Sequence, residues 1–192
     1  MIQGMELGRE DQIAEWDMAM QEHAMTFDML LPNFFRYSLI VLVFLVVENK
    51  LGELCRAVKN VRGNIPSPPC PKNNIVNEYK KYLIKHAGIS GLQWDKIHDL
   101  NKIRNCIVHA SGKVKGFRHE SHLRRLARRE IGLSISGDDY DAEDALQPLY
   151  LDDDMLVLEP EYCKGVIKNI RGFFEELCNA VPLPRLTVNQ DS

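Results

Sequence analysis

At positions 39–47 the sequence reads Leu39-Ile40-Val41-Leu42-Val43-Phe44-Leu45-Val46-Val47, an apolar run without a break. The run is too short for a membrane-spanning helix, which needs about 20 apolar residues. Its β-branched residues would suit a buried strand, but the segment Glu48–Arg56 continues with helical spacing, and Pro32 suits the first turn of a helix. We therefore predict one long helix from Pro32 to about Asn60, apolar on all sides in its middle. A helix without a solvent face is a central one, either surrounded within one protomer or also facing a second subunit.

The remaining segments are also mainly helical in pattern. Five further helices are predicted, at Glu6–Met25, Asn77–Ala87, Leu92–Ala110, Phe117–Glu130 and Pro160–Ala180. Gly88 closes the second of these, and Ser111 with Gly112 stops the third. Short apolar segments predict a small β element, at Leu133–Ser136, Leu149–Leu151 and Met155–Leu158. The fold class is therefore mainly α, with a small β insert before the last helix.

The chain of 192 residues has the composition of an ordinary globular domain. We divide it into an N-terminal helical segment (1–31), a helical domain (32–180, including the 113–158 insert) and a C-terminal tail (181–192). A net charge of -3 argues against a protein that coats nucleic acid over its whole surface. Five scattered cysteines without a CxxC pair indicate a reducing, cytoplasmic setting. No targeting signal and no membrane segment are predicted.

The helix at Leu92–Ala110 carries the residues of chemical interest. At ~100° per residue, Leu100, Ile103 and Val108 share a broad apolar arc, and Arg104 falls inside it. Asn101, Asn105 and His109 form an i, i+4, i+8 stripe along the edge of that arc. A buried arginine is costly unless it is paired. One interpretation is structural: Arg104 pairs with Glu48, and His109 merely caps or packs.

The string Arg104-Asn105-x-x-x-His109, late on an apolar helix and followed by Ser111-Gly112, resembles the R-x4–6-H motif of the HEPN superfamily. The order of elements is also similar, from the long apolar helix through the motif helix to a closing helix, over roughly 32–180. The resemblance implies an up-and-down helical bundle. It also implies a metal-independent endoribonuclease that acts as a homodimer on RNA, with two arginines and two histidines in one cleft. A role as a toxin or defence effector, restrained by an antitoxin or regulatory protein, is a further implication of the family.

These residue types suit the implied chemistry. A histidine can accept and donate the protons of RNA cleavage, and an always-charged, forked arginine can stabilise the phosphorane. The resemblance thus assigns proton transfer to His109 and the phosphate contact to Arg104. Asn105 could orient the imidazole or contact RNA, and Glu48 and Asn101 are supporting residues. No cofactor is predicted. His98 with Asp99, and His119 with His122, have near-metal spacings, but we interpret them as surface residues rather than ligands.

The charges reverse along the insert. Between Lys113 and Arg129 lie seven basic residues and one acid, and we predict RNA contacts from five of the basic ones: Lys113, Lys115, Arg118, Arg124 and Arg125. A solvated helix face is the alternative. From Asp138 to Asp154 there are eight acids and no lysine or arginine. That stretch could mask the basic arm, bind a basic partner, or be a solvated loop.

Two other functions stay open. The chain could be a non-catalytic HEPN module that binds RNA, nucleotide or a protein, with Arg104 and His109 retained for binding. It could also be a purely structural helical domain.

Overall fold

A computed structural model describes residues 9–71, 74–137 and 154–181. The fold is mainly α, as predicted, with one small antiparallel sheet. The helices are α1 (Arg9–Met25), the π-helical turn η1 (Thr26–Leu30), α2 (Leu31–Arg62), α3 (Ile75–Ala87), α4 (Trp94–Ala110), α5 (Glu120–Ala127) and α6 (Pro160–Ala180). The strands β1 (Leu133–Ile135) and β2 (Leu156–Leu158) lie between α4 and α6.

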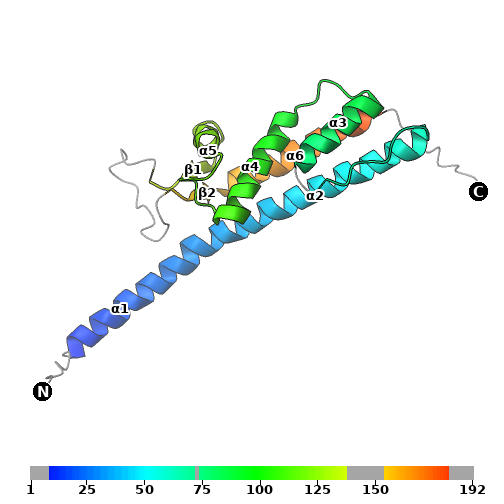
Figure 1. The fold of residues 1–192 in the computed structure, drawn as a ribbon. Helices are drawn as coiled ribbons and strands as arrows, with labels where there is room; N and C mark the ends of the chain where they lie inside the picture. Colours follow the sequence, from blue (N-terminus) through cyan, green and yellow to red (C-terminus); the bar gives the residue numbers. More distant parts are fainter. Residues whose placement is uncertain (1–8, 72–73, 138–153, 182–192) are drawn as a thin grey trace, which may run out of the picture.

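Helix α2 is the axis of the fold, and α3, α4 and α6 pack along it (Figure 1). It buries the apolar series Tyr37, Ile40, Phe44, Val47, Leu51, Cys55 and Val58, whose spacing of three and four residues marks one helix face. The long helix is confirmed. Of the two predicted settings for its apolar middle, burial on all sides within one protomer is not found, and the other, a face toward a second subunit, stays a prediction. Leu42 is 59% exposed and Val46 is 53% exposed, because the other helices cover α2 from one side only.

Most predicted helix boundaries hold within a few residues. Helix α6 has the predicted bounds, α3 ends at Gly88 with φ +71°, and α4 ends at Ser111 in the left-handed conformation. The helix predicted over 117–130 is wrong in length, because α5 has only eight residues. A turn in which the Glu120 amide donates to the Phe117 carbonyl precedes it, at 2.9 Å. Further turns follow it.

The β hairpin pairs Leu133 with Leu158 and Ile135 with Leu156. All four side chains are buried, so the hairpin closes one end of the core. It is joined to the start of α2 by Asn33, whose side chain accepts from the Leu158 amide at 3.0 Å and donates to the Leu156 carbonyl at 3.1 Å. The strand predicted at 149–151 lies outside the described residues.

Helix α1 extends away from the body of the protein, in line with α2 (Figure 1). Every side chain described between positions 12 and 21 is exposed. Of the predicted 6–25 helix, positions 6–8 lie outside the described residues, as do positions 182–192 of the predicted tail. Across the described ranges, none of the helices combines the length and the apolar character that crossing a bilayer requires.

Candidate functional site

Helix α4 carries a ladder of polar side chains in the predicted order. Arg104 Nη1 donates to Asn105 Oδ1 at 2.9 Å, and Asn105 Nδ2 donates to Asn101 Oδ1 at 3.1 Å. All three side chains are half-buried, whereas His109 is exposed in the last turn. Within the described ranges no hydrogen bond joins Asn105 to His109, so the ladder orients the arginine but does not reach the imidazole.

These side chains line one cavity of about 320 Å³. Most of its wall comes from three elements: α2, the start of α3, and α4. The loop before α5 adds a second arginine. The lining residues are Phe44, Glu48, Asn74, Ile75, Asn101, Arg104, Asn105, His109 and Arg118. The structure therefore brings together every residue predicted to act in catalysis or support, and it adds one of the predicted RNA contacts.

Arg104 is held over an aromatic ring. Its Cζ lies 5.5 Å from the centroid of the Phe44 ring, close enough for a cation–π interaction. Its Nε is buried and has no hydrogen-bond partner, the one such side-chain nitrogen or oxygen in the described part of the chain. An unsatisfied buried donor is costly and calls for an explanation.

Glu48 faces the same cavity but does not neutralise Arg104. Residues 9–71 and 74–137 contain both side chains, and no ion pair within 4.0 Å joins them. Burial raises the pKa of the Glu48 carboxyl, and the positive charge of Arg104 opposes that shift. This geometry therefore does not favour the structural interpretation, in which Arg104 pairs with Glu48. With Arg104 and Arg118 against one carboxyl, the cavity has an excess of positive charge.

The five predicted RNA contacts do not form one patch. Only Arg118 lines the cavity. Arg124 pairs with Glu120 at 3.0 Å and also with Asp154, Lys115 lies 3.6 Å from Asp154, and Arg125 contacts the His122 ring at 2.8 Å. Lys113 is exposed beside the end of α4. Asp154, the described end of the acidic stretch, thus partly covers the basic arm, one of the three alternatives left open above.

His122, outside the motif, has structural partners. His122 Nε2 lies 2.8 Å from Asp99 Oδ1 and 3.1 Å from the Lys102 amine, which joins α5 to α4. Among the residues that the structure describes, no three histidine, cysteine or acidic side chains are placed to hold a metal ion.

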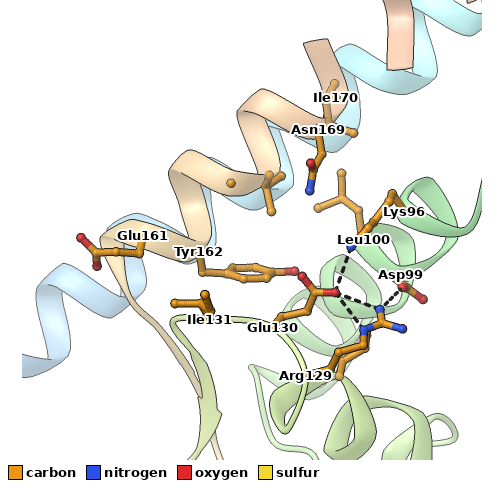
Figure 2. Close-up of a pocket in the computed structure, with 13 residues that line it drawn as sticks. Lys96, Asp99, Leu100, Arg129, Glu130, Ile131, Glu161, Tyr162, Asn169 and Ile170 are labelled. Atoms are coloured by element: carbon orange, nitrogen blue, oxygen red, sulfur yellow. Dashed lines mark hydrogen bonds and ion pairs between the residues drawn. The ribbon is translucent and has the colours of Figure 1, made fainter. Parts of the chain in front are cut away.

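A second cavity of about 420 Å³ lies between α4, α6 and the turn after α5 (Figure 2). Glu130 accepts from Lys96 at 3.0 Å and from Arg129 at 2.9 Å, and Arg129 also pairs with Asp99 at 3.0 Å. Burial acts to raise the pKa of Glu130, but these two cations hold it below its usual value. Two cations and three acids, Glu161 among them, line this cavity, so it lacks the positive excess of the Arg104 cavity. Sequence patterns did not indicate it.

Sequence reasoning also missed part of the Arg104 cavity. Phe44 reads as an ordinary core residue because it lies inside the apolar run. Asn74 and Ile75 precede the start predicted for α3, although an asparagine before an apolar residue is a typical helix start. Comparisons of the chain with protein-family models, with curated proteins and with solved structures find no match.

Proposed function

We propose that this protein is a metal-independent endoribonuclease of the HEPN type, a helical bundle in which α4 is the motif helix. The observation that carries the proposal is the shared cavity of Arg104, Asn105 and His109, with Arg118 opposite Glu48. Sequence spacing alone did not require these groups to meet other elements in one cavity. The permanent positive charge of Arg104 beside this cavity further supports an anionic ligand such as a phosphate.

The chemistry follows from these groups. A base removes the proton from a ribose 2′-hydroxyl, the 2′-oxygen attacks phosphorus, and the bond from phosphorus to the 5′-oxygen breaks. An acid then protonates the leaving 5′-oxygen, which leaves a 2′,3′-cyclic phosphate and a 5′-hydroxyl. His109, exposed at the end of α4, can exchange protons with the substrate, and the guanidinium of Arg104 can stabilise the charge of the phosphorane.

A second copy would complete the site. One cavity contains one imidazole, and with a second copy one histidine can accept the 2′-hydroxyl proton while the other donates a proton to the 5′-oxygen. Val108 is 47% exposed next to His109, so the last turn of α4 offers apolar surface at which a second copy can pack. We propose a homodimer with an Arg104 and a His109 from each copy in one cleft. A role as a toxin or defence effector under the control of a partner protein belongs to the same proposal.

The test uses the purified full-length protein and total RNA in EDTA. We expect cleavage with cyclic phosphate ends, and loss of cleavage in Arg104→Ala and in His109→Ala by roughly 100-fold or more. Arg171→Ala is the matched control, since Arg171 is exposed and pairs with Glu175 at 2.9 Å, outside the cavity. RNA that stays intact with the wild type but binds through Arg104 would instead indicate a non-catalytic binding module.

A further inference from the structure

The exposed apolar side chains of this protein are concentrated on one rod. Of the 16 large apolar residues that are exposed in the described ranges, 11 lie between Ile13 and Val46, along α1, η1 and α2. They include Trp16, 64% exposed, and Phe35, 71% exposed. An apolar surface of this extent marks a contact with another molecule.

Ten exposed residues on this rod follow one another at intervals of three or four, which is the spacing of a helix face within α1 and within α2, the two halves being separated by the π-helical turn η1. We call them the rod stripe: Ile13, Trp16, Met20, Ala24, Phe27, Leu31, Phe34, Ser38, Leu42 and Leu45. At 1.5 Å per residue the stripe is about 48 Å long. None of its side chains is buried by the rest of the chain.

The rod stripe is symmetric about position 29. Ile13 and Leu45 each lie 16 residues from that position, and the other members also form equidistant pairs: Trp16 with Leu42, Met20 with Ser38, Ala24 with Phe34, and Phe27 with Leu31. Two of these pairs match a large side chain with a small one, which favours close packing. A surface that matches its own reverse is what a twofold contact between identical chains requires.

Charge selects the direction of the two chains. Residues 9–25 contain five acids and one basic residue, Arg9, whereas residues 31–47 contain a single charged residue, Arg36. Parallel rods would place the two acidic α1 helices side by side, and like charges repel. Antiparallel rods place each α1 along the apolar part of the other α2. The acidic character of α1 also disfavours a membrane surface, because helices that lie on membranes are rich in lysine and arginine.

We infer that the rod stripe is a contact between two copies of this chain, which run antiparallel with their centre near position 29. Trp16 of each copy then packs against Leu42 of the other. The π-helical turn η1 lies at this centre, and its wider turn offsets the α1 half of the stripe around the rod axis. None of the cavity-lining residues belongs to the rod stripe, so this contact is distinct from the one proposed at Val108 and His109.

The test is cross-linking in the full-length protein, with exposed Cys70 and Cys178 replaced by serine. Trp16→Cys and Leu42→Cys are prepared as two separately tagged proteins and treated with a short bismaleimide, alone and after mixing. We expect a covalent dimer in the mixture and none in either protein alone. Homodimers of Trp16→Cys alone would indicate parallel rods and overturn the inference, and so would a mixture without cross-links.

A second measurement keeps the inference testable without cysteines. Trp16→Glu should weaken association by roughly tenfold or more in sedimentation experiments, because it places a charge in the contact. Ile84→Glu is the control, since Ile84 is a comparably exposed apolar residue on α3. Equal effects of the two substitutions would overturn the inference. Neither experiment uses RNA, so its failure is distinguishable from failure of the proposed cleavage activity.

Discussion

The guanidinium of Arg104 lies over the ring of Phe44, with 5.5 Å between Cζ and the ring centroid. The same guanidinium donates to Asn105 through Nη1, and its buried Nε has no acceptor. An arginine has five N–H donors, so one ring and one amide orient it while most of its hydrogen-bonding capacity stays unused. This arrangement is the one expected of an arginine that binds an anion.

The Phe44 ring is expected to matter for both stability and cleavage. Phe44→Leu should lower the free energy of unfolding by about 1–2 kcal/mol, because packing and the cation–π interaction are both lost. Cleavage should fall as well, since Arg104 loses part of its orientation. Phe173→Leu is the control: Phe173 is buried against Trp94, away from the cavity. It should lower stability without lowering cleavage by the folded protein, and equal cleavage by the two variants would contradict the prediction.

Glu48 should make stability depend on pH. Burial raises its pKa above the usual 4.5, so the folded state binds the proton more tightly than the unfolded state. The protonated carboxyl favours folding at low pH, and this contribution is lost as the pH rises through the raised pKa. Urea unfolding of the wild type and Glu48→Gln measures it: the stability of the wild type relative to the variant should decrease above pH 4.5. A constant difference across this range would refute the assignment.

Gly112 should not tolerate a side chain. Its φ is +88°, and an added Cβ would lie 2.7 Å from Cε2 of the Tyr37 ring. Gly116 has a similar φ of +75° but open space around it. Gly116→Ala should therefore cost only the backbone strain, about 1 kcal/mol, whereas Gly112→Ala should cost about 2–4 kcal/mol. Thermal or urea unfolding of the pair separates strain from clash, and equal losses would show that Tyr37 simply moves aside.

Asn33 is predicted to be critical for the hairpin. It is only 2% exposed and satisfies one carbonyl and one amide of β2. Asn33→Ala leaves the Leu158 amide without a partner, whereas the Leu156 carbonyl keeps the hydrogen bond from the Tyr37 hydroxyl, so the free energy of unfolding should fall by about 1–2 kcal/mol. Asn49→Ala, an exposed position on the same helix, should change it little. Hydrogen exchange of the Leu158 amide provides a direct readout, and unchanged protection of that amide in Asn33→Ala would contradict the prediction.

The helical elements could be predicted wherever the pattern and its end signals agreed. Pro160 begins α6 and the apolar stripe defines its inner face, so both bounds were predictable, although Ile167 on that stripe is 48% exposed. Val108 likewise belongs to the apolar arc of α4 but faces solvent. Periodicity identifies an apolar face without saying whether the same chain covers it. For that reason the pattern left open whether the exposed side of α2 is covered within the protomer or by a second subunit.

The site could be predicted in part. Arg104, Asn105 and His109 are neighbours on one helix, so local spacing was enough to group them. The contribution of Phe44 depends on how α2 crosses α4, and that of Arg118 depends on a loop, neither of which a local pattern determines. The basic residues Arg124 and Arg125 count equally with Arg118 in the sequence, but their ion pairs and ring contacts direct them elsewhere.

The bonds of Asn33 join positions 123 and 125 residues apart. During translation, α2 emerges from the ribosome early, whereas its hairpin partner emerges only after most of the chain has been made. Until Leu158 has left the exit tunnel, the Asn33 side chain at the start of α2 therefore lacks its hairpin partners. A nascent chain stalled before that point would lack this closure, which makes the short strand at positions 156–158 decisive for the completion of a core that begins at α2.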